Sequence, residues 1–239
     1  MRACRSILTF ILAGSLALFA QAKRTPVSWE FTPDPKLPNV LIIGDSISLG
    51  YTPLVRTMLQ GKANVIHPMR PDGKMPVNCA STTQGLADLQ KWLGNTKWAV
   101  IQFNWGLHDL CYRNPEAKTQ GNRDKEHGKI QVPLAEYKVN LDKLATELQK
   151  TGARLIWAST TKVPDDEIGR FTGDERRYND AAKEIMARHH IAIDDLYALS
   201  VSMPGELSLG PGNVHYTPEG YSRLARQVAD SIEQALEQK

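Results

Sequence analysis

The chain of 239 residues contains few cysteines, no internal repeats, no low-complexity tract and no large excess of charge. Three cysteines exclude a small domain held together by disulfides, and a chain of this length buries enough apolar surface without them. Lys and Arg number 29 against 26 Asp and Glu, so charge gives no argument for binding nucleic acid or an anionic membrane surface. The composition is that of one globular domain.

Long hydrophobic runs are also missing, except at the N-terminus. A basic start is followed by an apolar run from Ile7 to Ala20, and Ala20-Gln21-Ala22 has the small-residue pattern of a cleavage site. We therefore expect a signal peptide over residues 1–22, cleaved after Ala22, and a secreted or periplasmic protein without stable membrane insertion. An uncleaved anchor is the less favoured alternative because the apolar core is short.

Cleavage at this position changes both the charge and the cysteine count. It removes Arg2 and Arg5 and no acidic residue, so the formal charge falls from +3 to +1 and no nucleic-acid partner is expected. It also removes Cys4 and leaves Cys79 and Cys111 in an oxidising compartment. One disulfide and two separate buried thiols are equally open, since the Cα separation decides between them.

Short apolar runs alternate with longer segments of helical periodicity. We expect strands near 40–43, 64–66, 99–103, 155–158 and 191–193, and helices near 51–59, 83–93, 134–150, 174–189 and 217–237. This alternation predicts an α/β fold, a single three-layer α/β/α domain with a doubly wound parallel sheet. Thr217 as N-cap and Pro218 in the first turn mark the start of the last helix. Residues 23–38, with four prolines, form an expected irregular lead-in to a domain over residues 39–239.

Ser46 follows the first apolar run within Gly44-Asp45-Ser46 and is a candidate nucleophile. A serine hydroxyl needs a nearby general base, and His215, just before the last helix, has the side-chain type whose pKa suits that role. The alternatives are a helix N-cap for Ser46 and an ordinary surface histidine for His215. Because sites in open parallel sheets form beyond the carboxyl ends of strands, the two side chains are expected at that edge.

Three segments in this order resemble the SGNH (GDSL-like) hydrolase superfamily. Gly44-Asp45-Ser46-Ile47 resembles its Gly-Asp-Ser-Leu motif, Gly106-Leu107-His108-Asp109 resembles its Gly-x-Asn-Asp block, and Val214-His215 with the following Pro-x-Gly-Tyr resembles its Asp-x-x-His block. The resemblance runs from about Asn39 to the C-terminus. It implies a flavodoxin-like fold and a serine ester hydrolase with Ser46 as nucleophile and His215 as base.

The resemblance also implies the donors of an oxyanion hole. The backbone N–H of Ser46, a backbone N–H near Ala80 and the side chain of His108 are the candidates. His108 stands where the family has asparagine, and an imidazole donates a hydrogen bond only in the right tautomer, so a structural role for it is equally open. Asp109 and Asn104 are expected to order their own loops.

The family's triad aspartate is replaced by Gly212, three residues before His215. Three outcomes stay open: a Ser-His dyad held by a main-chain carbonyl, which we favour, a carboxylate from elsewhere, or a domain that no longer hydrolyses esters. The nearest carboxylates in the later chain are Asp194, Asp195 and Glu206. The competing function is therefore an impaired SGNH-like domain that binds a glycan or surface partner.

The segment from Tyr112 to Val132 is polar and too long for an ordinary connection, so we interpret it as a rim or lid over the site. Tyr112, Arg113, Arg123 and Lys125 are expected to face the substrate. A solvated surface loop is the alternative. Trp105 and Tyr216 lie beside the site in the sequence and are expected to contact a sugar ring, with a place in the core as the alternative for Trp105. No cofactor or metal is expected, because the histidines lack ligand-like spacing.

We predict a secreted esterase that acts on an acyl ester. The family resemblance and the expected export suggest that this ester is an O-acetyl group on a carbohydrate.

Overall fold

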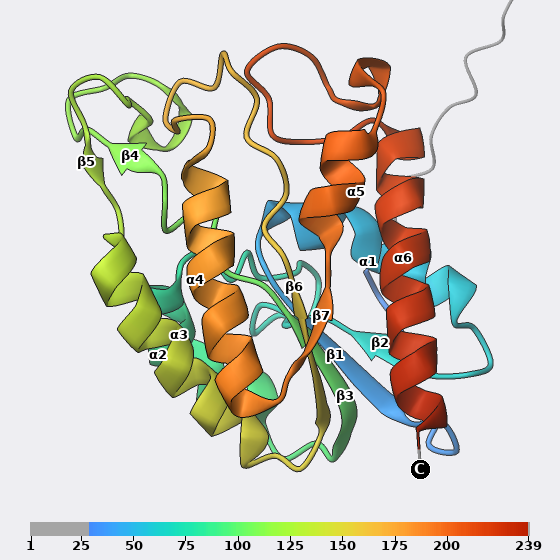
Figure 1. Ribbon diagram of the computed structural model, residues 1–239. Helices are drawn as coiled ribbons and strands as arrows, with labels where there is room; N and C mark the ends of the chain where they lie inside the picture. The colour runs from blue at the N-terminus through green and yellow to red at the C-terminus, as the bar shows by residue number, and fades with distance from the viewer. Residues whose placement is uncertain (1–28, 239) are drawn as a thin grey trace, which may run out of the picture.

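The computed structural model describes residues 29–238 and contains one central parallel sheet (Figure 1). Its strand order is β2-β1-β3-β6-β7, and every neighbouring pair runs parallel. The strands are β1 (Asn39–Ile43), β2 (Asn64–Ile66), β3 (Trp98–Phe103), β6 (Arg154–Ala158) and β7 (Ala192–Asp194). This is the doubly wound, flavodoxin-like order, so the predicted fold class is confirmed.

The central strands are apolar along their whole length because helices cover both faces of the sheet. Val40, Leu41, Ile42 and Ile43 of β1 are all 0 % exposed. In a sheet with one solvated face, every second residue would be polar. The continuous apolar run that predicted a strand is thus explained by burial on both sides.

The helices form two layers (Figure 1). On one face α3 packs between α2 and α4, and on the other face α6 packs against α1 and α5. The bounds are α1 (Ser46–Met58), α2 (Thr82–Leu93), α3 (Leu134–Gln149), α4 (Asp174–His189), α5 (Leu196–Ser202) and α6 (Pro218–Glu237). The short α5 was not predicted. The N-terminus of α6 is as expected, with the Thr217 side chain accepting from the Gly220 N–H at 3.3 Å.

Helix α1 begins five residues before the predicted start at 51. The side chain of Asp45 caps it by accepting from the Ile47 N–H at 2.9 Å, so Ser46 is its first residue. Gly50 weakens the helical pattern in the sequence but is needed for packing, because a Cβ there would lie 2.0 Å from the Tyr221 ring of α6. The close approach of α1 and α6 thus overrides the low helix propensity of glycine.

The chain reverses its direction of travel through the sheet between β1 and β3. Segments that follow these two strands therefore meet at the carboxyl edge, where ligand sites of such folds form. Ser46 follows β1, and the loop from Asn104 to Asp109 follows β3.

The cysteines of this region, Cys79 and Cys111, are buried and not bonded to each other, so the possible disulfide does not form.

The segment between Tyr112 and Val132 is less irregular than predicted. It contains a small antiparallel ribbon of β4 (Tyr112–Arg113) and β5 (Lys129–Ile130), with the short helix η1 (Gln120–Asn122) between them. A second short helix, η2 (Gly205–Leu207), precedes α6. The ribbon and η1 lie in the connection that follows β3, and η2 lies in the connection that follows β7.

The described part of the lead-in lies across α1 and β2. Trp29 contacts His67 edge-on with ring centroids 5.8 Å apart, and Arg56 lies 4.6 Å above the Phe31 ring. The Asn64 amide donates to the Asp34 carbonyl at 2.8 Å. The predicted signal peptide, residues 1–22, lies outside the described residues. Within residues 29–238 no helix combines the length and the apolar character needed to cross a bilayer.

Candidate active site

Ser46 lies at the N-terminus of α1, and its hydroxyl faces His215. The distance from Ser46 Oγ to His215 Nε2 is 2.8 Å, although 169 residues separate them in the chain. As the first residue of a helix, Ser46 has a backbone N–H without an intrahelical partner, at the positive end of the helix dipole. This placement suits both a nucleophile and a donor to an oxyanion.

The other ring nitrogen of His215 is held by Asn213. Nδ1 lies 2.8 Å from Asn213 Oδ1, and the backbone N–H of His215 donates to the same oxygen at 3.0 Å. A backbone N–H can only donate, which fixes this atom as the oxygen of the amide and makes Nδ1 the protonated nitrogen. Nε2 is then unprotonated and able to accept the proton of Ser46. Asn213 therefore sets the His215 tautomer that a general base needs.

Asn213 was not predicted from the sequence, because a main-chain carbonyl or a carboxylate from elsewhere in the chain was expected in this position. Asp194 instead accepts from Gln227 at 2.7 Å, and Asp195 accepts from Ser159 at 2.7 Å. The signal was present, since asparagine often accepts from the backbone N–H two residues later. Such a turn places the asparagine side chain next to the residue two positions later, which here is His215.

Gly212, at the position of the family's aspartate, has no space for a side chain. Its φ is +66°, and a Cβ there would lie 2.5 Å from the Asp166 carbonyl oxygen. The segment 165–167 therefore occupies the volume through which an acidic side chain would pass. The imidazole partner comes from the next residue, Asn213.

The cavity beside Ser46 and His215 has a volume of about 340 Å³. His108 lines it together with Asn78 and Asn213. Burial lowers the pKa of His108 to about 3, and the charges of Arg170 and Arg113 act in the same direction. His108 is therefore neutral near pH 7 and can donate one hydrogen bond into the cavity.

The backbone N–H of Ala80, the third predicted oxyanion donor, already has a hydrogen-bond acceptor. It donates to Asn78 Oδ1 at 3.0 Å, while Ala80 itself has a left-handed φ of 49°. A substrate oxygen would have to compete with Asn78 for this hydrogen. The donors that stay available at the site are the Ser46 N–H and the His108 ring.

Burial lowers the pKa of His215 below its ordinary value of 6.5. The buried carboxylate of Asp45 opposes this shift, and the charges of Arg170 and Arg123 add to it. Burial in turn raises the pKa of Asp45. The net effect is a lowered pKa, which favours the neutral form of His215 that can accept a proton.

Of the residues expected on the rim, Arg113 and Arg123 line the cavity. Tyr112 points elsewhere and packs edge-on against Phe171, with centroids 5.2 Å apart. Lys125 lies 5.6 Å above the same Phe171 ring. Of these four residues, only the two arginines line the cavity.

The predictions that Trp105 and Tyr216 contact the substrate are wrong, because both side chains belong to the core. Trp105 is 0 % exposed, and its Nε1 donates to the Cys79 carbonyl at 3.3 Å. Tyr216 is 5 % exposed and packs edge-on against Tyr221. Proximity to the motif in sequence did not indicate the direction of these side chains, which the helices around them determine.

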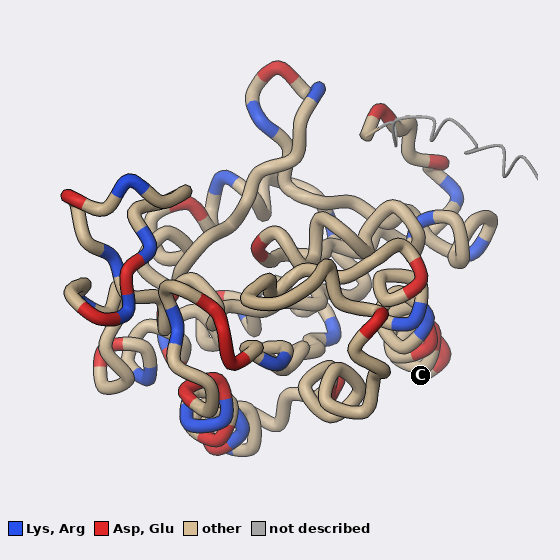
Figure 2. The backbone as a smooth tube through the Cα atoms, turned by 90° about the horizontal axis from the view of Figure 1, so that it is seen from above, with Lys and Arg blue, Asp and Glu red and all other residues tan. Residues whose placement is uncertain are grey.

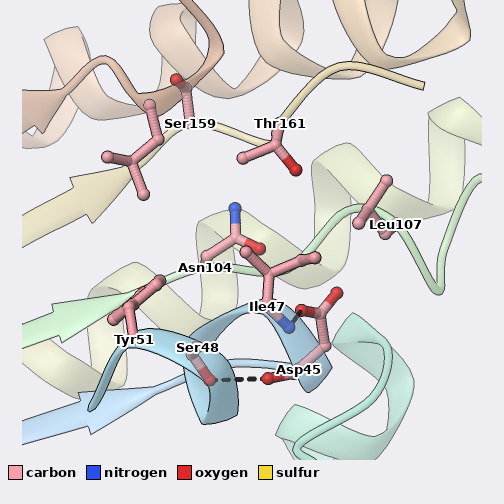
Figure 3. Close-up of a pocket in the computed structure, with 9 residues that line it drawn as sticks. Asp45, Ile47, Ser48, Tyr51, Asn104, Leu107, Ser159 and Thr161 are labelled. Carbon is pink, nitrogen blue, oxygen red and sulfur yellow. Dashed lines mark hydrogen bonds between the residues drawn. The ribbon is translucent and has the colours of Figure 1, made fainter. Parts of the chain in front are cut away.

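Two polar side chains hold the site loops in place instead of ordering only their own segments. Asn104 donates to the Ala158 carbonyl at 2.7 Å and points toward the segment after β6 (Figure 3). Asp109 accepts from the Thr82 N–H at 2.9 Å and so fixes the start of α2. These bonds join the loop that carries His108 to two neighbouring elements.

No three His, Cys, Asp or Glu side chains in the described part converge as a metal site would require.

The chain belongs to the GDSL-like lipase/acylhydrolase family, whose model matches residues 42–223. The matched span includes Ser46 and His215, and it confirms the resemblance found in the sequence. Membership places the chain among the acyl ester hydrolases. A comparison with curated protein sequences found no match.

Solved structures of esterases share the fold. A lipase/acylhydrolase from Enterococcus faecalis is 20 % identical with a TM-score of 0.65, over 84 % of this chain and 98 % of that one. The acetyl xylan esterase AlAXEase is 14 % identical with a TM-score of 0.64, over 81 % and 99 %. Axe2, an acetylxylan esterase from Geobacillus stearothermophilus, is 17 % identical with a TM-score of 0.62, over 84 % and 95 %. At these identities the likeness concerns the fold alone.

Proposed function

We propose that this protein is an exported serine carboxylic-ester hydrolase that removes small acyl groups, acetyl above all, from carbohydrates. The 2.8 Å contact between Ser46 Oγ and His215 Nε2 carries the proposal. A serine that only caps a helix would not need an imidazole in the acceptor tautomer at hydrogen-bond distance. Asn213 completes a Ser-His-Asn arrangement with a neutral third member.

In the proposed reaction, Ser46 Oγ attacks the acyl carbon while Nε2 of His215 takes the hydroxyl proton. The charge on the carbonyl oxygen is stabilised by the Ser46 N–H and the His108 ring. His215 then returns the proton to the departing alcohol, leaving an acyl-serine. Water attacks this ester with His215 again as base, which releases the acid and restores the Ser46 hydroxyl.

The small acyl group and the sugar are inferred from the character of the cavity. Among the residues that line it, Asn78, Gln120 and Asn213 offer amides, and three arginines add charge. Such a wall suits hydroxyl-rich substrates better than long acyl chains, which require apolar surface. The names of AlAXEase and Axe2 describe acetyl xylan esterases with the same fold.

The experiment compares the chain without residues 1–22 with its Ser46→Ala variant on 4-nitrophenyl acetate, 4-nitrophenyl octanoate and acetylated xylan. We expect turnover of the acetate and the xylan, little turnover of the octanoate, and loss of all of it in Ser46→Ala. The exposed Ser202, on α5 away from the cavity, gives the control Ser202→Ala, which should match the unmodified chain. Turnover retained in Ser46→Ala would remove Ser46 from the mechanism.

Labelling with a fluorophosphonate separates the enzyme from the competing glycan-binding function. An activated serine forms a stable adduct at Ser46 that intact-mass and peptide analysis locate. The absence of an adduct from mildly acidic to mildly alkaline pH would favour the binding protein.

Export is tested by expressing the full chain and sequencing the N-terminus of the mature protein, which should begin at Lys23.

A further inference from the structure

Three arginines from separate parts of the chain line the cavity beside Ser46. Arg113 ends β4, Arg123 follows η1, and Arg170 precedes α4. Arg113 and Arg123 were expected on the rim from the sequence, whereas no sequence pattern indicated Arg170. Basic and acidic positions are intermixed along the backbone (Figure 2), whereas three arginines line this one cavity.

Within residues 29–238, only one carboxylate pairs with these arginines. Glu167 is 0 % exposed, and its Oε1 accepts from Arg123 at 2.7 Å and from Arg170 at 3.0 Å. Arg113 forms no ion pair with any residue between 29 and 238, and its bonds go to the neutral oxygens of Gln131 and Gly121. Asp45 lines the cavity and Glu167 lies behind it, so three arginines stand against two acids and the formal surplus is one positive charge.

The arginines are fixed in place before any substrate binds. Arg170 is 5 % exposed and donates from Nε to the Leu107 carbonyl at 2.6 Å, next to His108. Arg113 donates from Nε to Gln131 at 2.9 Å. In Arg113, Arg123 and Arg170 alike, Nη2 has no hydrogen-bond partner within residues 29–238. Preorganised guanidinium groups with free donors are the usual means of binding a carboxylate or sulfate.

We propose that this arginine wall, formed by Arg113, Arg123 and Arg170, binds an anionic group of the substrate, so that the enzyme prefers acetylated acidic glycans to neutral ones. The inference rests on the proposed function and specifies its substrate class. The anion is a carboxylate, as in a uronic acid, or a sulfate ester, since both offer coplanar or tripodal oxygens to guanidinium donors. The wall lines the same cavity as Ser46 and His215, so an anionic group bound to it would lie close to the reacting ester.

The test measures kcat/KM on O-acetylated methyl glucuronoside, methyl glucoside and methyl glucoside 6-sulfate. We expect a preference of about tenfold for at least one anionic substrate over the neutral one, reduced at about 0.5 M NaCl. The ratio between the uronate and the sulfate identifies the group. Equal kcat/KM for all three substrates would overturn the inference and leave the esterase function intact.

Variants assign the preference to the wall. Arg113→Gln, which leaves no carboxylate unpaired, should bring the ratio of anionic to neutral kcat/KM close to one, and Arg113→Lys should restore part of it. Arg154, exposed at the amino end of β6 on the opposite edge of the sheet, gives the charge-matched control Arg154→Gln, which should keep the ratio. If Arg113→Gln does not fold by circular dichroism, Arg123→Gln replaces it. An unchanged ratio in the folded variant contradicts the proposal.

Binding without turnover separates this inference from the proposed function. Methyl glucuronoside, methyl glucoside and methyl glucoside 6-sulfate are titrated calorimetrically into the Ser46→Ala variant. Tighter binding of either anionic sugar, weakened by Arg113→Gln in the same background, supports the arginine wall even if no ester is hydrolysed. Equal or undetectable binding of all three sugars overturns it whatever the catalytic result.

Discussion

The side-chain oxygen of Asn213 accepts from His215 twice, from Nδ1 at 2.8 Å and from the backbone N–H at 3.0 Å. This double contact orients the ring and its tautomer without a negative charge. An aspartate in this role would also stabilise the imidazolium that forms during the reaction, which a neutral amide does only through its dipole. The geometry of a triad is therefore retained, while part of its electrostatics is absent.

The role of Asn213 is tested by removing its side chain and by restoring a charge. Asn213→Ala frees the ring tautomer and should lower kcat, by up to about 10⁴-fold. Asn213→Asp keeps the acceptor and adds a negative charge, so it should raise the pKa of His215 and increase kcat above that pKa. Steady-state kinetics on 4-nitrophenyl acetate measures both. Equal kcat in Asn213→Ala and the unmodified chain would contradict the assignment.

The acid limb of the pH profile should lie below pH 6.5, the ordinary value for histidine. Burial lowers the pKa of His215, and the base must be neutral to accept a proton, so activity is lost only when pH falls below this lowered pKa. Asp45 acts in the opposite direction. Asp45→Asn, whose amide oxygen can still accept from Ile47, should therefore move the limb of kcat/KM to lower pH. A shift to higher pH would exclude this electrostatic assignment.

His108 should act through hydrogen bonding to the oxyanion. Since its pKa is lowered to about 3, mainly by burial, its contribution should not change between pH 5 and 8. His108→Ala should lower kcat by about 10²- to 10³-fold with a small effect on KM. His108→Asn supplies an amide donor at the same place and should recover part of the rate. If both variants lose only stability and keep kcat, the ring has a structural role.

Gly212 should tolerate no side chain. Gly212→Asp adds a Cβ 2.5 Å from the Asp166 carbonyl at a left-handed φ of +66°, so we expect a loss of about 2–4 kcal/mol in unfolding free energy. Gly61 has a similar φ of +76° but open space around it. Gly61→Ala should cost only about 1 kcal/mol for the backbone conformation. Similar losses in Gly212→Ala and Gly61→Ala, measured by urea unfolding, would show that the contact with Asp166 is unimportant.

Asp109 should make stability depend on pH. Burial raises its pKa from 3.8 to about 7, so between these values the folded state holds a proton that the unfolded state has lost. Stability from this group is therefore complete below pH 3.8 and decreases as pH rises to about 7. Asp109→Asn should remove this decrease, on the order of 4 kcal/mol over the whole range and about 3 kcal/mol between pH 5 and pH 8. Urea unfolding of both proteins at pH 5 and pH 8 tests the difference, and parallel curves would refute it.

Much of the fold could be read from the sequence because burial on both faces leaves a one-dimensional signal. The strand run at 40–43 and the capped helix from Pro218 follow from apolar periodicity and terminal residues. The order of Ser46 and His215 along the chain, with the parallel sheet, predicted that they meet at one edge. The start of α1 was missed because Gly50 is required by Tyr221, a contact between helices far apart in the sequence.

The sequence by itself determined the family, the doubly wound sheet and the pair Ser46 and His215, because motif order and periodic burial are properties of the chain. Only the tertiary structure decided that Asn213 holds the imidazole, that Trp105 lies in the core, and that Arg170 reaches the cavity. These outcomes depend on the direction of single side chains in loops. That direction is set by local φ values and by contacts such as Gly212 with Asp166, which no periodic pattern encodes.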